Sequence, residues 1–192
     1  MNSVLRANGY DNHAQLLEKH IKRRIPAQIG NEGLVLELKI DAGIGAPESY
    51  EILPVLGGYQ IVGADSLGLY YGIGKLLHSA KWSDADFVPA PPAGVVTPAC
   101  SFRATYFAIH FYNWYQQAPT EELETYVEEM LLWGYSTIIA VIPTVNMSTL
   151  EDASPVILYS AFTVFPVFVI ALEKDFVVLS RFTHPLIPLY ET

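Results

Sequence analysis

Hydrophobic residues in the first forty positions repeat first at helical spacing and then at strand spacing. Apolar residues such as Leu17 and Ile21 recur at helical spacing after Asp11, which can cap a helix, and they predict a helix over 11–24. Apolar and charged residues alternate toward the end of 34–40. This alternation predicts a half-buried strand.

The next pattern predicts a hairpin followed by a second helix. Two short apolar runs, 50–55 and 59–64, are separated by Leu56-Gly57-Gly58, which is typical of a turn between paired strands. Asp65-Ser66 then supplies a cap for a helix over 67–80, whose apolar residues form one stripe. We expect this helix to pack on the hairpin.

Three glycines interrupt the second predicted helix, and they are Gly68, Gly72 and Gly74. Glycine is unfavourable inside a helix, so we expect these positions to allow a close approach to the sheet. A phosphate-binding loop ending at Lys75 would need glycine at Leu69 and Ser or Thr at Leu76. A dinucleotide fingerprint would need its third glycine at Leu77. Neither nucleotide motif is present.

The second half of the chain begins after a proline-rich stretch. Residues 83–101 lack hydrophobic periodicity and predict an extended linker between two domains. An aromatic strand over 102–111, a polar and aromatic loop over 112–118, a helix over 120–134 and an apolar strand over 136–142 are expected next. Strand, helix and buried strand in this order predict a right-handed crossover between parallel strands.

The last forty residues show a different pattern. Residues 154–172 carry no charge, and their length would allow a transmembrane span. Pro155 and Pro166 interrupt the run, its β-branched and aromatic content suits strands, and no basic flank is present. We therefore interpret 151–192 as a divergent apolar tail, and keep membrane association through 154–172 as the alternative.

Composition excludes one class of partner and leaves others open. The chain has 192 residues, 51% of them hydrophobic, and a net charge of −9 with 11 Lys and Arg. Because nucleic-acid binding requires clustered cations, no nucleic-acid partner is expected. The basic run Lys22-Arg23-Arg24 complements the dipole at the end of the first helix. No secretion signal is visible, so localisation stays open between secreted and cytoplasmic.

Other polar residues form no metal, cofactor or acid-base site in the sequence. His13 and His20 lack a second ligand at useful spacing, so we expect packing or surface roles and no metal. Cys100 is the only cysteine, so no disulfide forms within the chain. The glutamates of helix 120–134 are expected on its solvated face. No cofactor is predicted.

Three stretches of the chain, in order, resemble one family of enzymes. They are YEILPVLGGYQIVGADSLGLYYGIGKLLHSAKW (50–82), SFRATYFAIHF (101–111) and WGYSTIIAVIP (133–143). The first resembles the second domain of family 20 β-hexosaminidases and of the related α-glucuronidases, and the others resemble the first two strands of their barrel. The resemblance implies an α+β accessory domain of β-α-β-β-α type over 1–82, followed over 102–150 by the first β-α-β unit of an incomplete TIM-like barrel.

The resemblance also implies a substrate site. Arg103 matches the arginine that grips sugar hydroxyls in family 20, for which the forked guanidinium is suited. The alternative is that Arg103 pairs with a core carboxylate at the barrel floor. His110, Asn113 and Trp114 are expected near the carboxyl end of the same strand, where Trp114 would stack on a sugar and Asn113 would bond a hydroxyl. The alternative for this segment is an aromatic loop that packs on its neighbour.

No catalytic residue is predicted in this chain. In family 20 the acid pair is an Asp-Glu on the fourth barrel strand, and the residues after Ser101 are far fewer than the roughly 250 of a closed barrel. Ala108 and His110-Phe111 also stand where the hexosaminidase strand has Asp and Arg. We therefore expect a truncated glycoside hydrolase, inactive alone, whose full-length relative cleaves terminal amino-sugar or uronic-acid glycosides. A non-catalytic interaction or membrane-associated protein is the alternative.

Overall fold

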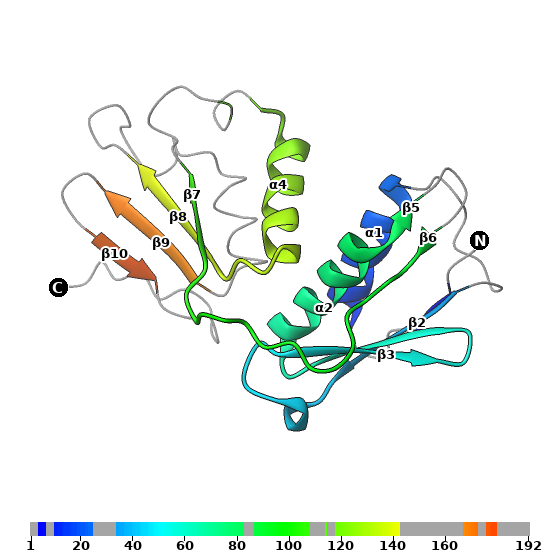
Figure 1. Cartoon of the computed structure of the whole chain (residues 1–192). Coiled ribbons are helices and arrows are strands. Elements are labelled where there is room, and N and C mark those ends of the chain that lie inside the picture. The colour runs from blue at the N-terminus through cyan, green and yellow to red at the C-terminus, as the bar shows by residue number, and fades with distance from the viewer. Residues whose placement is uncertain are drawn as a thin grey trace. The chain divides into compact units, whose positions relative to one another are not determined.

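The chain forms two compact units, each with its own sheet. The computed structural model (Figure 1) describes residues 4–6, 10–24, 34–82, 87–107, 114, 118–142, 167–172 and 176–179. The first unit comprises 1–101 together with 132–134, and the second comprises 102–131 together with 135–192. The assignment of these parts to named domains stays a prediction.

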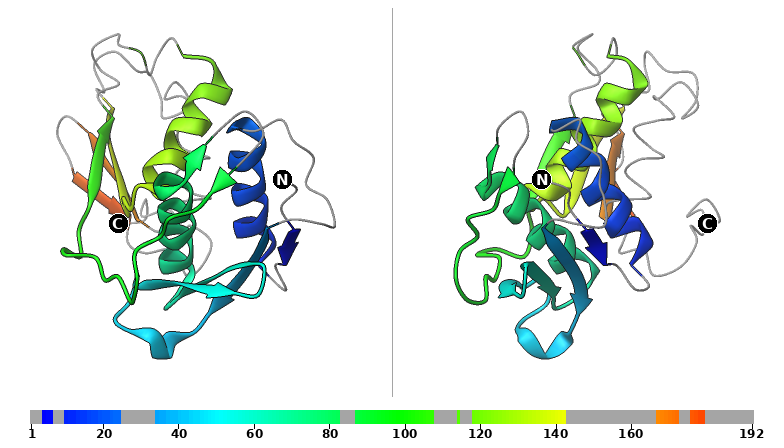
Figure 2. Two further views of the ribbon diagram at one scale, coloured as in Figure 1. Left: turned by 45° about the vertical axis from the view of Figure 1, so that its right-hand side comes forward. Right: turned by 90° about the vertical axis from the view of Figure 1, so that its right-hand side faces the viewer.

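The first unit is a four-stranded sheet with two helices over one face (Figure 2). Its strand order is β1-β2-β4-β3, in which β2 runs parallel to β1 and β4 and β3 is antiparallel to β4. The elements are β1 (Val4–Arg6), α1 (Asp11–Arg24), β2 (Val35–Ile40), a short 3-10 turn η1 (Ala42–Ile44), β3 (Tyr50–Val55), β4 (Gly58–Gly63) and α2 (Ser66–Ser79). The predicted mixture of helices and strands is confirmed for this unit, but its order is β-α-β-β-β-α, with one strand more between the helices than the expected β-α-β-β-α type.

The core of the first unit lies between the sheet and the two helices. Its fully buried side chains come from α1, β2, β4 and α2, and they are Leu17, Leu36, Ile61, Leu69, Ile73, Leu76 and Leu77. These are the positions at which the sequence repeats at helical or strand spacing, so hydrophobic burial explains why each element forms.

The hairpin turn is one residue shorter than predicted. Gly58 is the first residue of β4 and pairs with Val55, so the turn consists of Leu56 and Gly57. Gly57 has φ +80, a conformation that favours glycine. A two-residue loop is the commonest hairpin connection, and it shifts the predicted start of the second strand by one position.

The α2 glycines do allow close approaches, of Gly72 to the sheet and of Gly68 to the residue just before β3. A Cβ at Gly68 would lie 2.2 Å from the carbonyl oxygen of Ser49, and one at Gly72 would lie 2.6 Å from Cγ2 of Ile61. A Cβ at Gly74 would lie 1.8 Å from the carbonyl oxygen of Leu132, which also belongs to the first unit. The prediction that Gly74 approaches the sheet is therefore wrong.

The proline-rich stretch packs in part on the first unit. β5 (Lys81–Trp82) pairs with β6 (Phe87–Val88), and the Phe87 side chain is buried. Val96 forms an isolated bridge with Tyr50 at the edge of β3. The interpretation of 83–101 as an interdomain linker stays a prediction.

The second unit is a sheet in the order β10-β9-β8-β7. β7 and β8 are parallel, with α4 between them in the chain, so the predicted crossover between parallel strands is confirmed. β9 continues the sheet parallel to β8, whereas β10 is antiparallel to β9. The elements are β7 (Ala104–Phe107), α4 (Thr120–Leu132), β8 (Thr137–Ile142), β9 (Val167–Leu172) and β10 (Phe176–Leu179).

The described strands of the second unit do not close a barrel, since the sheet they form has β7 at one end and β10 at the other. This agrees with the expectation of an incomplete β/α segment. The part of the apolar tail that the structure describes is strand, as its composition indicates. Within the described ranges, no helix has the length and apolar character needed to cross a bilayer.

His13 joins α1 to the start of α2. Its ring stacks on Tyr70 at 3.9 Å, and its Nε2 donates to the carbonyl oxygen of Ser66 at 3.1 Å. Nε2 also lies 3.1 Å from the Ser66 hydroxyl. The side chain is buried, which confirms the expected packing role. Burial lowers the pKa of His13, and the bond to Ser66 offsets part of this effect.

This geometry predicts that the first unit loses stability in mild acid. Because the pKa of His13 is lower in the folded state than its ordinary 6.5, the unfolded state binds more protons as pH falls below that value. The free energy of unfolding should therefore decrease from pH 7 toward pH 5, and His13→Gln should weaken this dependence. Urea unfolding at several pH values measures the effect. His78→Gln is the control, and an unchanged pH dependence in His13→Gln contradicts the prediction.

Candidate functional site

Arg103 lies immediately before β7, with its backbone fixed by the start of β8. Its carbonyl oxygen accepts from the amides of Ser136 at 2.9 Å and Thr137 at 3.1 Å. The Ser136 hydroxyl also lies within hydrogen-bond distance of the Arg103 amide and carbonyl. Ser136 and Thr137 are buried and Arg103 is half-buried. The guanidinium is therefore carried by a rigid backbone, which suits a binding residue.

Trp114 packs against α4 and keeps part of its surface exposed. Its ring centroid lies 5.5 Å from that of Tyr126, with the rings tilted by 60°. The Trp114 side chain is 43% exposed. The contact with Tyr126 agrees with the alternative for this segment, in which an aromatic loop packs on its neighbour, but it accounts for only part of the ring. The exposed remainder leaves the proposed stacking on a sugar as a prediction.

The other two predicted binding residues, His110 and Asn113, lie outside the described residues. Arg103 and Trp114 flank β7 on opposite sides in the chain, and β7 spans roughly 13 Å at the usual rise per residue. Arg103 precedes the strand and Trp114 follows it, so a sugar held by both would need the guanidinium to extend along the strand.

The described residues offer no metal centre, because no group of three or more His, Cys, Asp or Glu side chains in that part of the chain could hold an ion. Glu121 and Glu122 are exposed in the first turn of α4, where carboxylates favour the helix dipole. Cys100 is exposed and is not in a disulfide. The exposure of Glu121 and Glu122 fits the solvated face that the sequence predicts for this helix.

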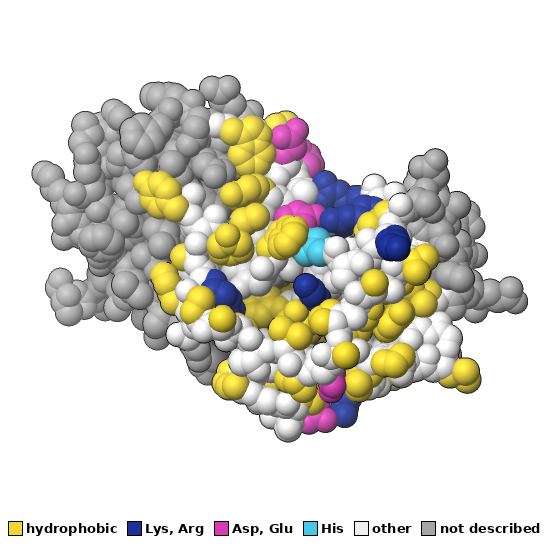
Figure 3. Space-filling view, in the orientation of Figure 1, with side chains coloured by type: hydrophobic (Ala, Val, Ile, Leu, Met, Phe, Trp, Pro, Cys, Tyr) yellow, Lys and Arg dark blue, Asp and Glu magenta, His cyan; other side chains and the backbone are white. Residues whose placement is uncertain are grey.

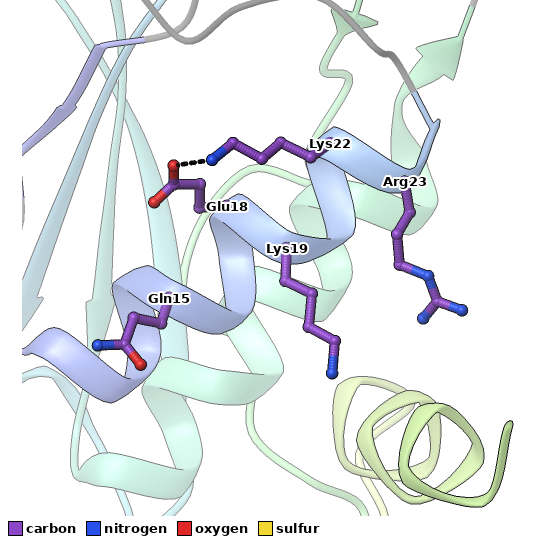
Figure 4. A pocket seen from close by; sticks show the side chains of 5 residues that line it. All are labelled: Gln15, Glu18, Lys19, Lys22 and Arg23. Carbon is purple, nitrogen blue, oxygen red and sulfur yellow. Dashed lines mark ion pairs between the residues drawn. The ribbon is translucent and has the colours of Figure 1, made fainter. Parts of the chain in front are cut away.

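A hollow of about 430 Å³ lies along α1 (Figure 4). Its lining residues are Gln15, Glu18, Lys19, Lys22 and Arg23. Glu18 and Lys22 form an exposed ion pair one helical turn apart, and Lys19 and Arg23 extend from another side of the helix (Figure 4). Surface pairs of this kind contribute little free energy. The hollow has the charge pattern of a solvated helix face.

The structure contains an aromatic pair that the sequence does not predict. His78, in the last turn of α2, stacks on Trp133 with ring centroids 4.0 Å apart and planes 16° from parallel. Trp133 is 62% exposed. Its place directly after a helix, followed by Gly134, is a local signal for a surface position. Its pairing with a distant histidine has no local signal.

Comparison with solved structures identifies the class of fold. The chain is similar to a glycoside hydrolase family 20 β-N-acetylglucosaminidase, with 20% identity and a TM-score of 0.57 over 86% of this chain and 37% of the other. It is similar to CpGH84B, with 16% identity and a TM-score of 0.58 over 89% of this chain and 33% of the other. It is also similar to a mutant Streptomyces plicatus β-hexosaminidase in complex with the product GlcNAc, with 16% identity and a TM-score of 0.53 over 74% of this chain and 30% of the other.

The chain therefore has the fold of part of a glycoside hydrolase. It spans about a third of the length of each of these three proteins. No protein-family model and no curated protein sequence matches it. The expected glycoside-hydrolase-like fold is confirmed, while the particular family, the substrate and the activity are matters for proposal.

Proposed function

We propose that the chain supplies the accessory domain and the first barrel strands of a glycoside hydrolase that removes terminal amino-sugar or uronic-acid residues. In this proposal 1–82 is the accessory domain, 102–150 begins the barrel, and Arg103, His110, Asn113 and Trp114 contribute to the substrate site. The chain by itself binds sugar weakly and does not hydrolyse it.

The observation that carries the proposal is the extent of the structural similarity. A single alignment with the family 20 β-N-acetylglucosaminidase covers 86% of this chain. Since neither unit is that large, the alignment includes parts of both. The parallel series β7, β8 and β9 agrees with the start of a β/α barrel. The relative crystallised with GlcNAc indicates the kind of ligand to test.

The chemistry of the proposed site is binding rather than bond cleavage. The guanidinium of Arg103 can donate two parallel hydrogen bonds to adjacent sugar oxygens, and the exposed side of Trp114 can cover the apolar face of a pyranose. The sequence contains no Asp-Glu dipeptide of the kind that performs hydrolysis in family 20. The acid pair in this proposal lies outside the chain.

Two assays on the purified chain test the proposal. We expect no release of 4-nitrophenol from its N-acetyl-β-glucosaminide or β-glucuronide, and weak binding of GlcNAc or glucuronic acid by calorimetry. Arg103→Ala should lower that affinity by about tenfold, equivalent to about 1.4 kcal/mol. Arg103→Lys should be intermediate because an ammonium cannot form the paired bonds.

Arg23→Ala, on the exposed face of α1, is the matched control and should leave sugar binding unchanged. Turnover that disappears in Arg103→Ala would show a competent enzyme and contradict the proposed inactivity. Sugar binding that is absent, or that is equal in wild type and Arg103→Ala, would remove the support for a site at β7 and favour a non-catalytic interaction role.

A further inference from the structure

A second aromatic surface lies in the first unit and includes none of the residues assigned to the proposed substrate site. Trp133 is 62% exposed although the preceding residue, Leu132, is buried and the following residue, Gly134, turns with φ +92. Trp side chains are highly buried on average and are enriched at binding interfaces, so a largely exposed indole is a candidate binding surface.

The Trp133 ring is stacked on a side chain of α2, and its neighbouring backbone also packs on that helix. The imidazole of His78 covers one face of the indole at 4.0 Å, in a nearly parallel stack. The backbone next to Trp133 packs closely on α2, since a Cβ on Gly74 would lie only 1.8 Å from the carbonyl oxygen of Leu132. Since α2 supplies both contacts, the indole needs little ordering on binding, which favours affinity.

The surroundings of the indole suit a sugar better than an apolar protein surface. Lys75 is exposed on α2 three residues before His78, a spacing that makes the two residues neighbours on the helix surface, and an ammonium there can donate to hydroxyl or carbonyl oxygens. Figure 3 shows one face of the molecule, on which hydrophobic side chains lie next to polar and charged ones. A stable protein interface needs about 800 Å² from each partner, whereas a pyranose ring needs only the area of one indole.

We propose that Trp133, backed by His78, is a surface binding platform for N-acetylhexosamine oligosaccharides. The apolar C–H face of one sugar unit packs on the outward indole face, and its hydroxyl or acetamido oxygens accept from Lys75. The inference deepens the proposed function, on which its choice of sugar rests, by giving the first compact unit a substrate-holding role of its own. His78 acts as a positioning residue through the indole.

The test follows the indole N–H signals of the full chain, which has three tryptophans, by ¹⁵N NMR during titration with triacetylchitotriose. We expect the Trp133 signal to move, and Trp133→Ala to lower affinity by about tenfold. Trp133→Phe should retain part of the affinity, and His78→Ala should weaken binding while His78→Phe restores it. Val88→Ala, at another exposed apolar position in the first unit, is the control for non-specific effects.

An unmoved Trp133 signal, or equal affinity in Trp133→Ala and wild type, overturns the platform. Because Trp133 is largely exposed, its replacement should leave the unfolding midpoint unchanged, and circular dichroism checks this. Binding lost in Arg103→Ala or Trp114→Ala but kept in Trp133→Ala overturns the platform and supports the site at β7. The reverse pattern supports the platform and removes the β7 site from the proposed function.

Discussion

Gly68→Ala is expected to destabilise the first unit by roughly 3 kcal/mol. The added methyl group would lie 2.2 Å from the carbonyl oxygen of Ser49. That oxygen cannot move freely, because it accepts from the amide of Ala64 at 2.8 Å. Relief of the clash therefore requires α2 and the start of β3 to separate. Urea unfolding followed by circular dichroism measures the loss.

The sign of the change makes this test decisive. An alanine in place of a glycine inside an unobstructed helix would stabilise by about 1 kcal/mol, so a variant at least as stable as wild type would contradict the close approach. Gly134→Ala is the matched control, since a Cβ there meets nothing within 4 Å and only its φ of +92 opposes substitution. We expect that control to cost about 1 kcal/mol.

Asp65→Ala should produce the second large effect, about 2–4 kcal/mol. One carboxylate oxygen of Asp65 accepts from the amide of Gly68 at 2.8 Å and caps α2. The other accepts from the amide of Glu48 at 2.9 Å. Glu48 is buried and has φ 66, a conformation that costs free energy for a residue with a side chain. Loss of the carboxylate would leave the cap and this segment without their shared acceptor.

Asp65→Asn should lie between wild type and Asp65→Ala, because the amide group keeps one acceptor and loses the other. The control is Asp41→Ala, which removes similar bonds to Gly43 and Lys39 at an exposed turn and should change thermal unfolding little. Equal midpoints for Asp65→Ala and Asp41→Ala would show that Asp65 does not join the two segments.

The elements that sequence predicts well are those whose signals are local. Asp11 and Asp65 stand at the starts of α1 and α2, and the helix before Gly134 ends close to the predicted residue. The hairpin differs by one position because either Gly57 or Gly58 suits a turn, and only the pairing of Gly58 with Val55 decides between them. Strand register depends on a partner that a local pattern does not name.

Contacts between distant residues explain what the sequence does not reveal. Gly74 is recognisable as a close-approach position, but its partner, the carbonyl of Leu132, becomes adjacent only through folding. The stack of His78 on Trp133 has the same origin. At the candidate site, Arg103 is indicated by the resemblance of 101–111 to the first barrel strand of a known family, whereas its anchoring by Ser136 depends on the parallel pairing of β7 with β8.

The direction of β10 limits which residues can meet at one rim of the second sheet. β7, β8 and β9 point their carboxyl ends the same way, while Leu179 at the end of β10 pairs with Phe168 near the beginning of β9. A ligand resting on the carboxyl rim would thus meet the last residues of three strands but the opening residue, Phe176, of the fourth. Uniform βα repetition, in which every strand delivers a loop to one common mouth, is interrupted at that strand.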